Sequence, residues 1–572
     1  MDNLARKEIE IDAFATDEAS PAANAILAAN PLVELNAGAI FTTYADLFGT
    51  IARQPERVWS AAGKLGAELL KIFAGQSAIA PQAGDRRFED PTWKDNPAYH
   101  ALMQGYLAWR QTALGLVEGD DSGADWKASA QHRFAMMLLT EALAPTNTLL
   151  GNPAALKRAF ETAGVSLIEG LRNFVDDLVN NGGMPSMVDK RPFKVGQTLA
   201  TTPGSVIFRN ELCEVIQYAP ATKQVRARPV LLVPPQINKF YVMDLAPKRS
   251  LIEYAVAQGI QFFTISWVNP GPAYRDRGLN DYVGAIKQVI EVITTLTGSP
   301  DINLLAVCSG GMTATLLLGH LAAIGDKRIN AATLLVTMLD SGDASMTGMF
   351  ATEETVQAAV ARSRAKGVLD AGTMARLFAW LRPNDLVWNY WVNNYLMGKS
   401  PAPFDILYWN VDSTNLPAAL HAGFLDLLLR NPLVAPDQID VLGTPINLGS
   451  VTNDMYIVGG MTDHICSWRA CYRAARLVGG ATEFVLNSSG HVQTLVCPPT
   501  NFKAKYFTNP RLVADPDKWI EGATEHKGSW WDNWLEWLQR RSGEWRPPPA
   551  ALGSATYRPI EAAPGSFVHQ LP

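Results

Sequence analysis

The chain has 572 residues, enough for two ordinary domains, and 48% of them are hydrophobic, which supplies a sizeable core. A formal net charge of −6 without dense lysine and arginine runs argues against a dedicated nucleic-acid-binding protein. No apolar run is long enough to span a bilayer, and the acidic, polar start MDNLARKEIEID predicts no secretory signal.

Residues 1–200 are expected to form a mainly helical N-terminal domain. Apolar residues recur at helical spacing over 41–73, with an interruption at Pro55, and again over 132–145 and 155–181. The glycines after Asn181 end this pattern. No strand-rich core is visible in this third of the chain.

Residues 201–572 are expected to form an α/β domain. Short apolar, β-branched runs alternate with helical stretches, which predicts a mostly parallel, doubly wound sheet buried on both faces. The predicted strands are 213–218, 229–234, 261–266, 302–307, 333–338, 454–458 and 482–486.

Two segments of this domain break the alternation. Residues of about 340–435 are helical in pattern and rich in tryptophan and tyrosine, so they are expected to form a cap inserted between two strands. The tail after Trp545 is rich in proline and is expected to wrap the surface in an extended form.

A cysteine occupies the turn after the predicted strand 302–307. The run Ala306-Val307-Cys308-Ser309-Gly310-Gly311 has the small residues that the strained strand–turn–helix of an α/β-hydrolase nucleophile requires. The backbone N–H of Ser309 would then donate to an oxyanion, and the helix N-terminus would favour negative charge there. Considered alone, Cys308 fits a buried structural cysteine equally well.

An acid and a histidine follow in the chain order that this fold requires. Asp463 comes after the predicted strand 454–458, and His491 comes after the predicted strand 482–486. Asp463 lies 155 residues beyond Cys308 (463 − 308), a gap that a cap insertion explains, and His491 lies 28 residues beyond Asp463 (491 − 463). We therefore predict a Cys308–His491–Asp463 triad.

The second oxyanion donor is expected in the loop 233–241. Pro234 and Pro235 have no N–H, so the first free amides are those of Gln236 and Ile237, of which Ile237 is our choice. The alternative is that the prolines only stiffen the end of a strand.

The other cysteines and histidines are assigned structural roles. Cys466 and Cys471 fall on the helix after Asp463 and are expected to be packed thiols that face different ways, and His464 is expected to pack or hydrogen-bond within its loop. Five sparse cysteines without a Cys-x-x-Cys pair indicate reduced thiols in a cytoplasm, and the scattered histidines predict no metal site.

A cysteine nucleophile favours acyl transfer over hydrolysis. A nearby histidine lowers the pKa of a thiol, and the thiolate attacks thioesters well. Transfer from one thioester to another keeps the acyl group activated, whereas a serine ester would lose that activation. The expected chemistry is therefore acyl transfer from a coenzyme A-type thioester, with the aromatic cap excluding water.

Taken together, these stretches resemble the polyhydroxyalkanoate synthases over nearly the whole chain. The similar stretches include GDRRFEDPTWKDNPAYH, LATTPGSVIFRNELCEVIQY, VPPQINKFYVMDL, VCSGG, RPNDLVWNYWVNNYLMG, SSGHVQTL and GSWWDNWLEWL. The family usually has Gly-x-Cys-x-Gly-Gly at the nucleophile, and this chain has Ala306 in place of the first glycine. We expect slight repacking there and retained activity.

The resemblance implies that Cys308 takes an (R)-3-hydroxyacyl unit from coenzyme A and carries the growing polyester, while His491 deprotonates the thiol. Asp463 would either orient His491 or help to activate the incoming hydroxyl group. No metal or redox cofactor is implied. Family members work as homodimers on cytoplasmic polyester granules, so the amphipathic stretch 40–74 is either a granule contact or a packed helix.

The substrate and the class of activity have alternatives. The motif wording, including Gln493, resembles the single-subunit branch that uses medium-chain units rather than short ones. The enzyme alternatives are a polyester depolymerase or an acyl-CoA thioesterase of the same fold, and net coenzyme A release without polymer would support them. A non-catalytic granule-coat protein is the alternative from another class.

Overall fold

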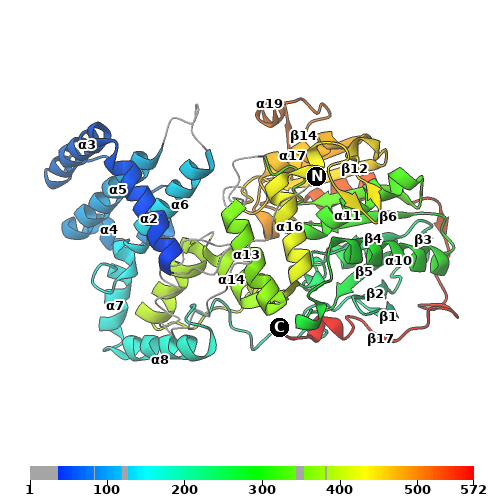
Figure 1. The fold of residues 1–572 in the computed structure, drawn as a ribbon. Coiled ribbons are helices and arrows are strands. Elements are labelled where there is room, and N and C mark those ends of the chain that lie inside the picture. The colour runs from blue at the N-terminus through cyan, green and yellow to red at the C-terminus, as the bar shows by residue number, and fades with distance from the viewer. Residues whose placement is uncertain (1–36, 83, 119–125, 343–352, 381–382) are drawn as a thin grey trace.

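The computed structural model describes residues 37–82, 84–118, 126–342, 353–380 and 383–572. The N-terminal stretch expected to hold no secretory signal lies outside these residues. Figure 1 shows a body of helices beside a larger body built on one sheet, with helices α13, α14 and α16 between them. None of the helices in the described part of the chain has the length and apolarity needed to cross a bilayer.

The first body confirms the mainly helical N-terminal region. Pro55 occupies the first turn of its helix, where the missing N–H costs nothing, so the sequence interruption is a boundary between two helices. Asn96 caps another helix by accepting hydrogen bonds from the amides of Ala98 and Tyr99. The helices are α2 (Ala37–Ala52), α3 (Pro55–Phe73), α4 (Thr92–Asp95), α5 (Pro97–Val117), α6 (Trp126–Ala142), α7 (Pro153–Glu161) and α8 (Val165–Asn180).

The second body contains an eleven-stranded sheet in the order β15-β14-β13-β12-β7-β6-β4-β5-β2-β1-β17. The strands are β1 (Gly204–Arg209), β2 (Cys213–Tyr218), β4 (Val230–Val233), β5 (Phe262–Trp267), β6 (Ile302–Val307), β7 (Ile329–Leu335), β12 (Asp454–Gly460), β13 (Thr482–Asn487), β14 (Lys505–Thr508), β15 (Thr524–Lys527) and β17 (Glu561–Ala562). The six central strands from β13 to β5 are parallel.

The expectation of a mostly parallel sheet is correct for the centre and wrong for both margins. Strand β2 pairs antiparallel with β5 and β1, and β14 pairs antiparallel with β13 and β15. The turn between β1 and β2 is too short for a crossover, and the Asn210 side chain closes it by accepting the amides of Leu212 and Cys213. The strand predicted at 333–338 instead begins at Ile329 and ends before Val336, whose φ is 45°.

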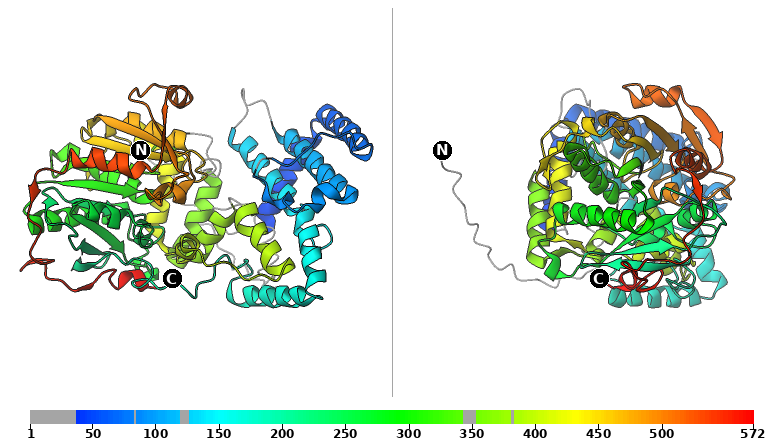
Figure 2. Two further views of the ribbon diagram at one scale, coloured as in Figure 1. Left: turned by 180° about the vertical axis from the view of Figure 1, so that it is seen from behind. Right: turned by 90° about the vertical axis from the view of Figure 1, so that its right-hand side faces the viewer.

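Helices cover both faces of the sheet, as near-continuous apolar strands require (Figures 1 and 2). Along β6, Leu304 and Ala306 point to the core under α10 (Leu279–Thr297), α11 (Ser309–Ile324) and α17 (Trp468–Leu477). Leu305 and Val307 point to the core under α9 (Leu251–Ala257) and α20 (Trp530–Gln539). Both the α/β fold and the alternation within each strand follow from this layering.

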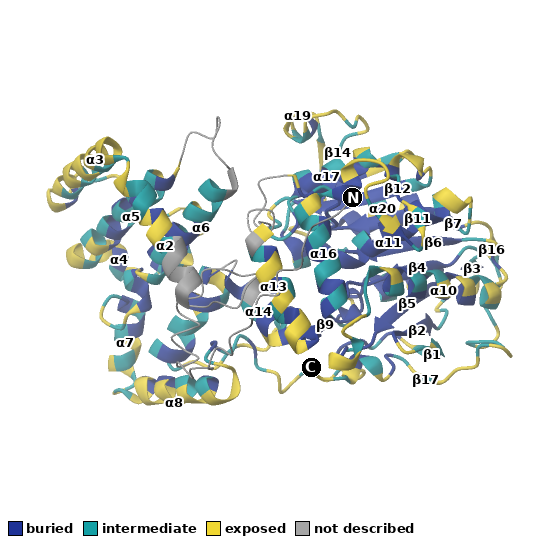
Figure 3. Ribbon diagram, in the orientation of Figure 1, coloured by how far each residue is buried: buried dark blue, intermediate teal, exposed yellow. Residues whose placement is uncertain are grey.

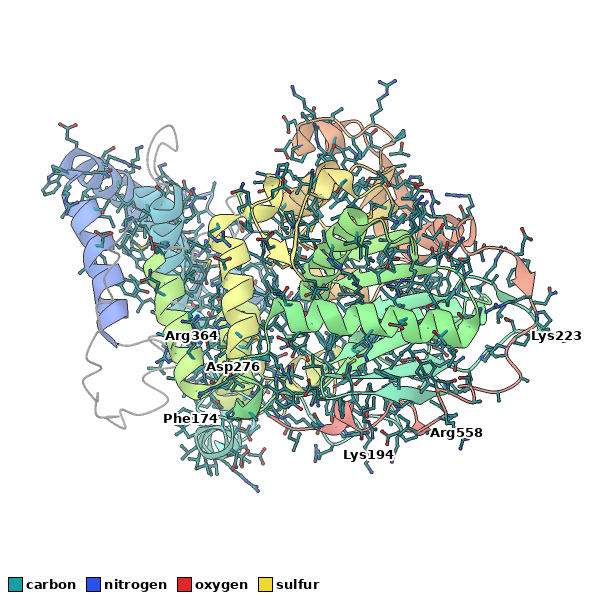
Figure 4. All side chains as sticks on the ribbon, turned by 45° about the vertical axis from the view of Figure 1, so that its right-hand side comes forward. Phe174, Lys194, Lys223, Asp276, Arg364 and Arg558 are labelled. Carbon is teal, nitrogen blue, oxygen red and sulfur yellow. The ribbon has the colours of Figure 1, made fainter. Side chains whose placement is uncertain are left out.

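The segment between β7 and β12 is mainly helical over its described residues, with two short strand pairs, β8 (Val368–Leu369) with β9 (Leu416–Pro417) and β10 (Asp440–Val441) with β11 (Thr444–Pro445). It holds α13 (Glu353–Lys366), α14 (Ala371–Trp380), two π-helical turns (Asn384–Trp388 and Trp391–Leu396), α15 (Asp405–Val411) and α16 (Ala418–Arg430). Phe174 on α8, labelled in Figure 4, packs edge-on against Trp391 and Tyr395 of the second π-helical turn. The Tyr395 hydroxyl donates to Asp177 at 2.8 Å, so this segment also holds the helical body in place.

The tail returns along the surface in extended form. Trp545–Arg546 (β16) pairs with Val225–Arg226 (β3), and β17 pairs with β1 at one edge of the main sheet. The view from behind in Figure 2 shows this path. The tail therefore covers part of an edge whose backbone groups would otherwise be unpaired.

Candidate active site

The nucleophile position is a strained turn between β6 and α11. Cys308 has φ 52° and ψ −120°, a conformation rare for a residue with a side chain. Its N–H donates to the Leu335 carbonyl at 3.0 Å, and its carbonyl accepts the amides of Gly311 and Met312. Hydrogen bonds to the end of β7 and to the first turn of α11 thus hold the Cys308 backbone in the strained conformation. The Cys308 side chain is partly exposed.

Small residues around this turn are required by contact. A Cβ at Gly310 would overlap the carbonyl oxygens of Val233 and Pro234, and one at Gly311 would overlap the Thr337 side chain. Ala306 is fully buried in β6 and pairs with Val233 and Leu334, so its methyl group lies in the core. The two glycines, and not position 306, therefore meet the tightest contacts.

The predicted acid and histidine meet at the same edge of the sheet. Asp463 lies in the loop after β12, where its N–H donates to the Gly460 carbonyl, and His491 is the first residue of α18 (His491–Leu495) after β13. Asp463 Oδ2 and His491 Nδ1 are 2.6 Å apart, and both side chains are buried. Strands β6, β7 and β12 run parallel, so the turn at Cys308 and the loop of Asp463 lie at the same edge of the sheet. The structure thus pairs Asp463 with His491 at the edge that carries Cys308.

The electrostatics of this group favour an ion pair. Burial disfavours the charged form of His491, but the charges of Asp463 and of a Cys308 thiolate outweigh burial and raise the pKa of the histidine. The pKa of Cys308 is lowered, first by a hydrogen bond from Cys466 and then, against burial, by the charge of His491. The favoured state is a Cys308 thiolate beside a protonated His491.

Of the two residues predicted to supply oxyanion amides, Ser309 directly follows Cys308, and Ile237 lies in the loop after β4. Ser309 is the first residue of α11, so its N–H has no acceptor within the helix. The amide of Gln236 donates to Ser309 Oγ at 3.2 Å, which ties the loop after β4 to the turn. Ile237 is the next residue of that loop and is partly buried against the core. The loop after β4 is thus tied to the residue that follows Cys308, and the oxyanion role of Ser309 and Ile237 stays a prediction.

The helical segment between β7 and β12 clamps this loop. Lys239 Nζ lies 2.6 Å from Asp412 Oδ1, and the lysine side chain is only 4% exposed. The Tyr241 hydroxyl donates to the same carboxylate at 2.7 Å, and the Trp409 indole N–H donates to the Lys239 carbonyl at 2.8 Å. Thr414 adds a hydrogen bond to the Gln236 carbonyl. The insertion therefore fixes the segment in which the second oxyanion donor is predicted.

Cys466 is buried, as expected of a packed thiol, but it does not lie on the helix after Asp463. It precedes α17 and lies in the loop that Asp463 organises, because Asp463 Oδ1 accepts the amides of Ile465 and Cys466. Cys471 is buried on α17, and its thiol faces the Cys466 carbonyl at 4.0 Å.

Two family models match this chain. Residues 84–255 match the model described as "Poly-beta-hydroxybutyrate polymerase (PhaC) N-terminus", and residues 229–496 match the model of the alpha/beta hydrolase fold. The second match covers the six parallel strands of the sheet, the turn at Cys308 and both Asp463 and His491. The first match extends past residue 200, so the domain boundary predicted there stays a prediction.

Characterised relatives match almost from end to end. The chain is 47% identical over 544 residues to poly(3-hydroxyalkanoate) polymerase 1 of Ectopseudomonas oleovorans, a match covering 95% of this chain and 97% of that protein. It is 48% identical to polymerase 2 of the same organism, over 88% of this chain and 90% of that protein. The polymerase subunit PhaC of Cupriavidus necator is 39% identical, over 86% and 84% of the two chains.

Proposed function

The chain belongs to the poly(3-hydroxyalkanoate) polymerase family, and from this premise we propose that it polymerises (R)-3-hydroxyacyl units through a covalent thioester on Cys308. The observation that carries this proposal is the strained strand-to-helix turn at Cys308 together with the 2.6 Å contact between His491 and Asp463. The same geometry in a hydrolase would have to deliver water to the thioester, whereas here the helical insertion covers the neighbouring loop.

Acylation begins from the thiolate. The sulfur of Cys308 attacks the thioester carbonyl of the (R)-3-hydroxyacyl-CoA, and the amides of Ser309 and Ile237 stabilise the oxyanion that forms. The carbon–sulfur bond to coenzyme A breaks, and the departing thiolate takes the proton from His491. The products are the acyl-enzyme and free coenzyme A, with His491 neutral.

Elongation uses the neutral histidine as a base. Acylation removes the negative charge on Cys308 that had raised the pKa of His491, so the ring is ready to accept a proton. The 3-hydroxyl oxygen of one unit attacks the carbonyl of the other, its proton passes to His491, and the sulfur of Cys308 leaves as a thiolate. The resting ion pair is thereby restored.

Asp463 has one role in this proposal, which is to orient and charge His491. Its 2.6 Å contact to Nδ1 fixes the tautomer, leaves Nε2 toward the thiol and stabilises the imidazolium. Both Asp463 oxygens are occupied, one by His491 and the other by two backbone amides, so direct activation of the hydroxyl by Asp463 is disfavoured. The reaction as proposed uses only these side chains and needs no metal or redox cofactor.

The proposed substrates are medium-chain units, the proposed localisation is the cytoplasm at polyester granules, and the proposed assembly is a homodimer. A methylene group in an apolar pocket changes the binding free energy by about 1–3 kcal/mol, so few residues separate medium-chain from short-chain preference.

On the helical body, α3 exposes Trp59, Leu70 and Phe73, which favours the granule-contact interpretation of the stretch 40–74, although Leu47 on α2 is buried. The molecular mass by sedimentation tests the dimer.

The experiment that tests the activity supplies (R)-3-hydroxybutyryl-CoA and (R)-3-hydroxydecanoyl-CoA separately to the purified protein. Coenzyme A release is followed with a thiol reagent, and insoluble polyester is weighed in the same tubes. We expect polymer from the longer substrate and loss of both signals in Cys308→Ala.

Each other outcome is informative. Polymer from the shorter substrate alone would preserve the mechanism and refute the medium-chain preference. Coenzyme A release that yields only free hydroxy acid would identify a thioesterase, and new ends on added polyester would identify a depolymerase. A folded protein that pellets with granules but turns over neither substrate would be a granule-coat protein.

A further inference from the structure

The extended tail is anchored to the sheet body beyond β17. Glu214 on β2 is fully buried, and its carboxylate accepts hydrogen bonds from the Ser566 hydroxyl and the Phe567 amide, each at 3.0 Å. Val568, in the same turn of the tail, is 2% exposed and belongs to the core under α9 and α20. Because a buried carboxylate requires its partners, this part of the tail has a fixed place on the molecule.

Gln570 connects the anchored tail to the loop after β5. Its side-chain oxygen accepts the backbone N–H of Asn269 at 2.8 Å, and its backbone carbonyl accepts the Asn269 side-chain NH₂ at 3.4 Å. The other polar atom of that side chain, Asn269 Oδ1, accepts the backbone N–H of Asn415 at 3.0 Å. Asn269 therefore binds the tail with its two N–H groups and the helical insertion with its oxygen.

The segment of the insertion that Asn269 holds also lies along the loop after β4. Ser413 forms an antiparallel bridge with Asn238, and the Thr414 hydroxyl donates to the Gln236 carbonyl at 3.3 Å. Ile237 stands between the two loop residues that make these contacts. A shift of the insertion segment would therefore displace the amide that is predicted to bind the oxyanion.

The other side of the loop after β4 is fixed by α11. The Gln236 amide donates to Ser309 Oγ at 3.2 Å, and its side-chain NH₂ donates to Thr313 Oγ1 at 3.1 Å. The loop thus lies between the helix that follows Cys308 and the insertion, and the tail supports the insertion side. A displacement of about 1 Å in such a group can lower a rate severalfold or more, because transition-state hydrogen bonds depend on exact placement.

We propose that Gln570 and Asn269 are positioning residues for the reaction. Through these two side chains the tail holds the insertion segment 413–415 in place, and that segment fixes the Ile237 amide relative to the acyl carbonyl at Cys308. This rests on the proposed function, and specifically on the oxyanion role proposed for Ile237. In this role neither Gln570 nor Asn269 contacts the substrate or transfers a proton, so kcat should depend on them and KM should not.

The first test measures coenzyme A release by variants of the full chain over a range of acyl-CoA concentrations. Gln570→Ala removes the acceptor for the Asn269 N–H, Gln570→Glu keeps an oxygen there, and Asn269→Ala removes the link between tail and insertion. Since a hydrogen bond of this kind contributes modestly, kcat should fall about 2- to 10-fold in both alanine variants with KM unchanged. Gln570→Glu should stay near the wild-type kcat.

The second test observes the loop itself by hydrogen–deuterium exchange and mass spectrometry. In Gln570→Ala and Asn269→Ala the peptide that contains residues 236–241 should exchange faster, while the peptide from α11 should be unchanged. Ser554→Ala is the matched control, because it deletes a hydrogen bond of the tail that ends within the tail, from the Tyr557 amide to Ser554 Oγ. It should change neither kcat nor the exchange of the loop.

The outcomes separate this proposal from the proposed function. Unchanged kcat in a folded Asn269→Ala protein would overturn the proposal, whether or not the loop exchanges faster. A Ser554→Ala variant as slow as Gln570→Ala would overturn it too, since the tail would then contribute only general stability. If instead Cys308→Ala still releases coenzyme A at the wild-type rate, the proposed function fails, while loop exchange still reports whether the tail holds the loop.

Discussion

Helix α20 of the sheet body and helices α3 and α8 of the helical N-terminal body differ in how far their large apolar side chains are buried (Figure 3). On α20, Trp530, Trp534 and Trp537 are at most 1% exposed. On α3 of the helical body, Trp59 is 77% exposed and Phe73 is 83% exposed. The exposed apolar residues of the same body's α8 are Val165, Leu167, Ile168, Leu171, Val175 and Val179.

This difference follows from how each body is layered. A sheet covered on both faces buries every apolar side chain of its strands and of the helix faces that cover it. Helices at the outside of the helical body, such as α3 and α8, bury one side and leave the other to solvent, and exposed apolar surface of this extent is typical of a contact site. The division suggests that chemistry belongs to the sheet body and surface attachment to the helical body.

The largest expected effect comes from Asp463→Asn, which leaves the shape of the site in place. The amide carries no charge to stabilise protonated His491 and favours the wrong tautomer, so coenzyme A release should fall by about 10²- to 10⁴-fold. Circular dichroism should show an unchanged fold.

The same variant makes a prediction about pH. In the wild type the lowered pKa of Cys308 keeps the thiolate as the pH falls below the usual range of a thiol, near 8.5. Loss of the carboxylate lowers the pKa of His491, weakens the ion pair and raises the pKa of Cys308. The pH at which iodoacetamide alkylates Cys308 at half its maximal rate should therefore rise. A fall in this midpoint would contradict the ion-pair description.

The next largest effect is the loss of stability when a buried tryptophan is removed rather than an exposed one. Trp534→Ala should lower the free energy of unfolding of the sheet body by about 3–5 kcal/mol, since it empties a buried site and leaves Thr333, which accepts the indole N–H, without that bond. Trp59→Ala should change it by no more than about 0.5 kcal/mol. Urea unfolding followed by far-ultraviolet circular dichroism measures both, and comparable losses would refute the contrast between the two bodies.

Breaking the Lys239–Asp412 contact between the insertion and the loop after β4 should lower the free energy of unfolding somewhat less. Lys239→Met leaves the Asp412 carboxylate without its cation in a mostly buried position, so destabilisation of up to about 3–5 kcal/mol is expected. Thermal unfolding and coenzyme A release should both report the loss.

The double variant is the control for this pair. Lys239→Met combined with Asp412→Leu removes both charges and should recover most of the stability. If stability returns and turnover does not, the ion pair serves to place the oxyanion loop; if neither returns, its contribution to folding is larger than a single pair accounts for.

The smallest effect on the enzyme in solution is expected from Trp59→Ser combined with Phe73→Ser. Both side chains are exposed, so the unfolding temperature and coenzyme A release should stay near the wild-type values. The share of enzyme that pellets with polyester granules should fall several-fold. An unchanged share would move the attachment surface elsewhere, and a large loss of stability would show that these residues are packed in the assembled protein.

The sequence was most informative where local pattern decides structure. The helices of the N-terminal region, the strand before Cys308 and the strand before Asp463 were predicted because apolar periodicity and turn residues act over a few positions. The contact of Asp463 with His491 at the edge that carries Cys308 was also predictable, since neighbouring parallel strands end at one edge of a sheet.

Other features depend on contacts between distant segments and could not be read from local pattern. The antiparallel margins of the sheet depend on connection length and on which edge is free. Strand β17 comes from the tail, where Ala562 pairs with Ser205, a residue 357 positions earlier in the chain (562 − 205). The contact of the insertion with both α8 and the oxyanion loop joins three separated segments.

By itself, the sequence determined the helical N-terminal region, the central strands and the cysteine turn, because these follow from short-range sterics and from periodicity. Only the tertiary structure decided that one carboxylate serves two segments. Asp463 accepts the amide of Cys466 with one oxygen and holds His491 with the other, and the physical reason is that a loop's path is set by its own hydrogen bonds.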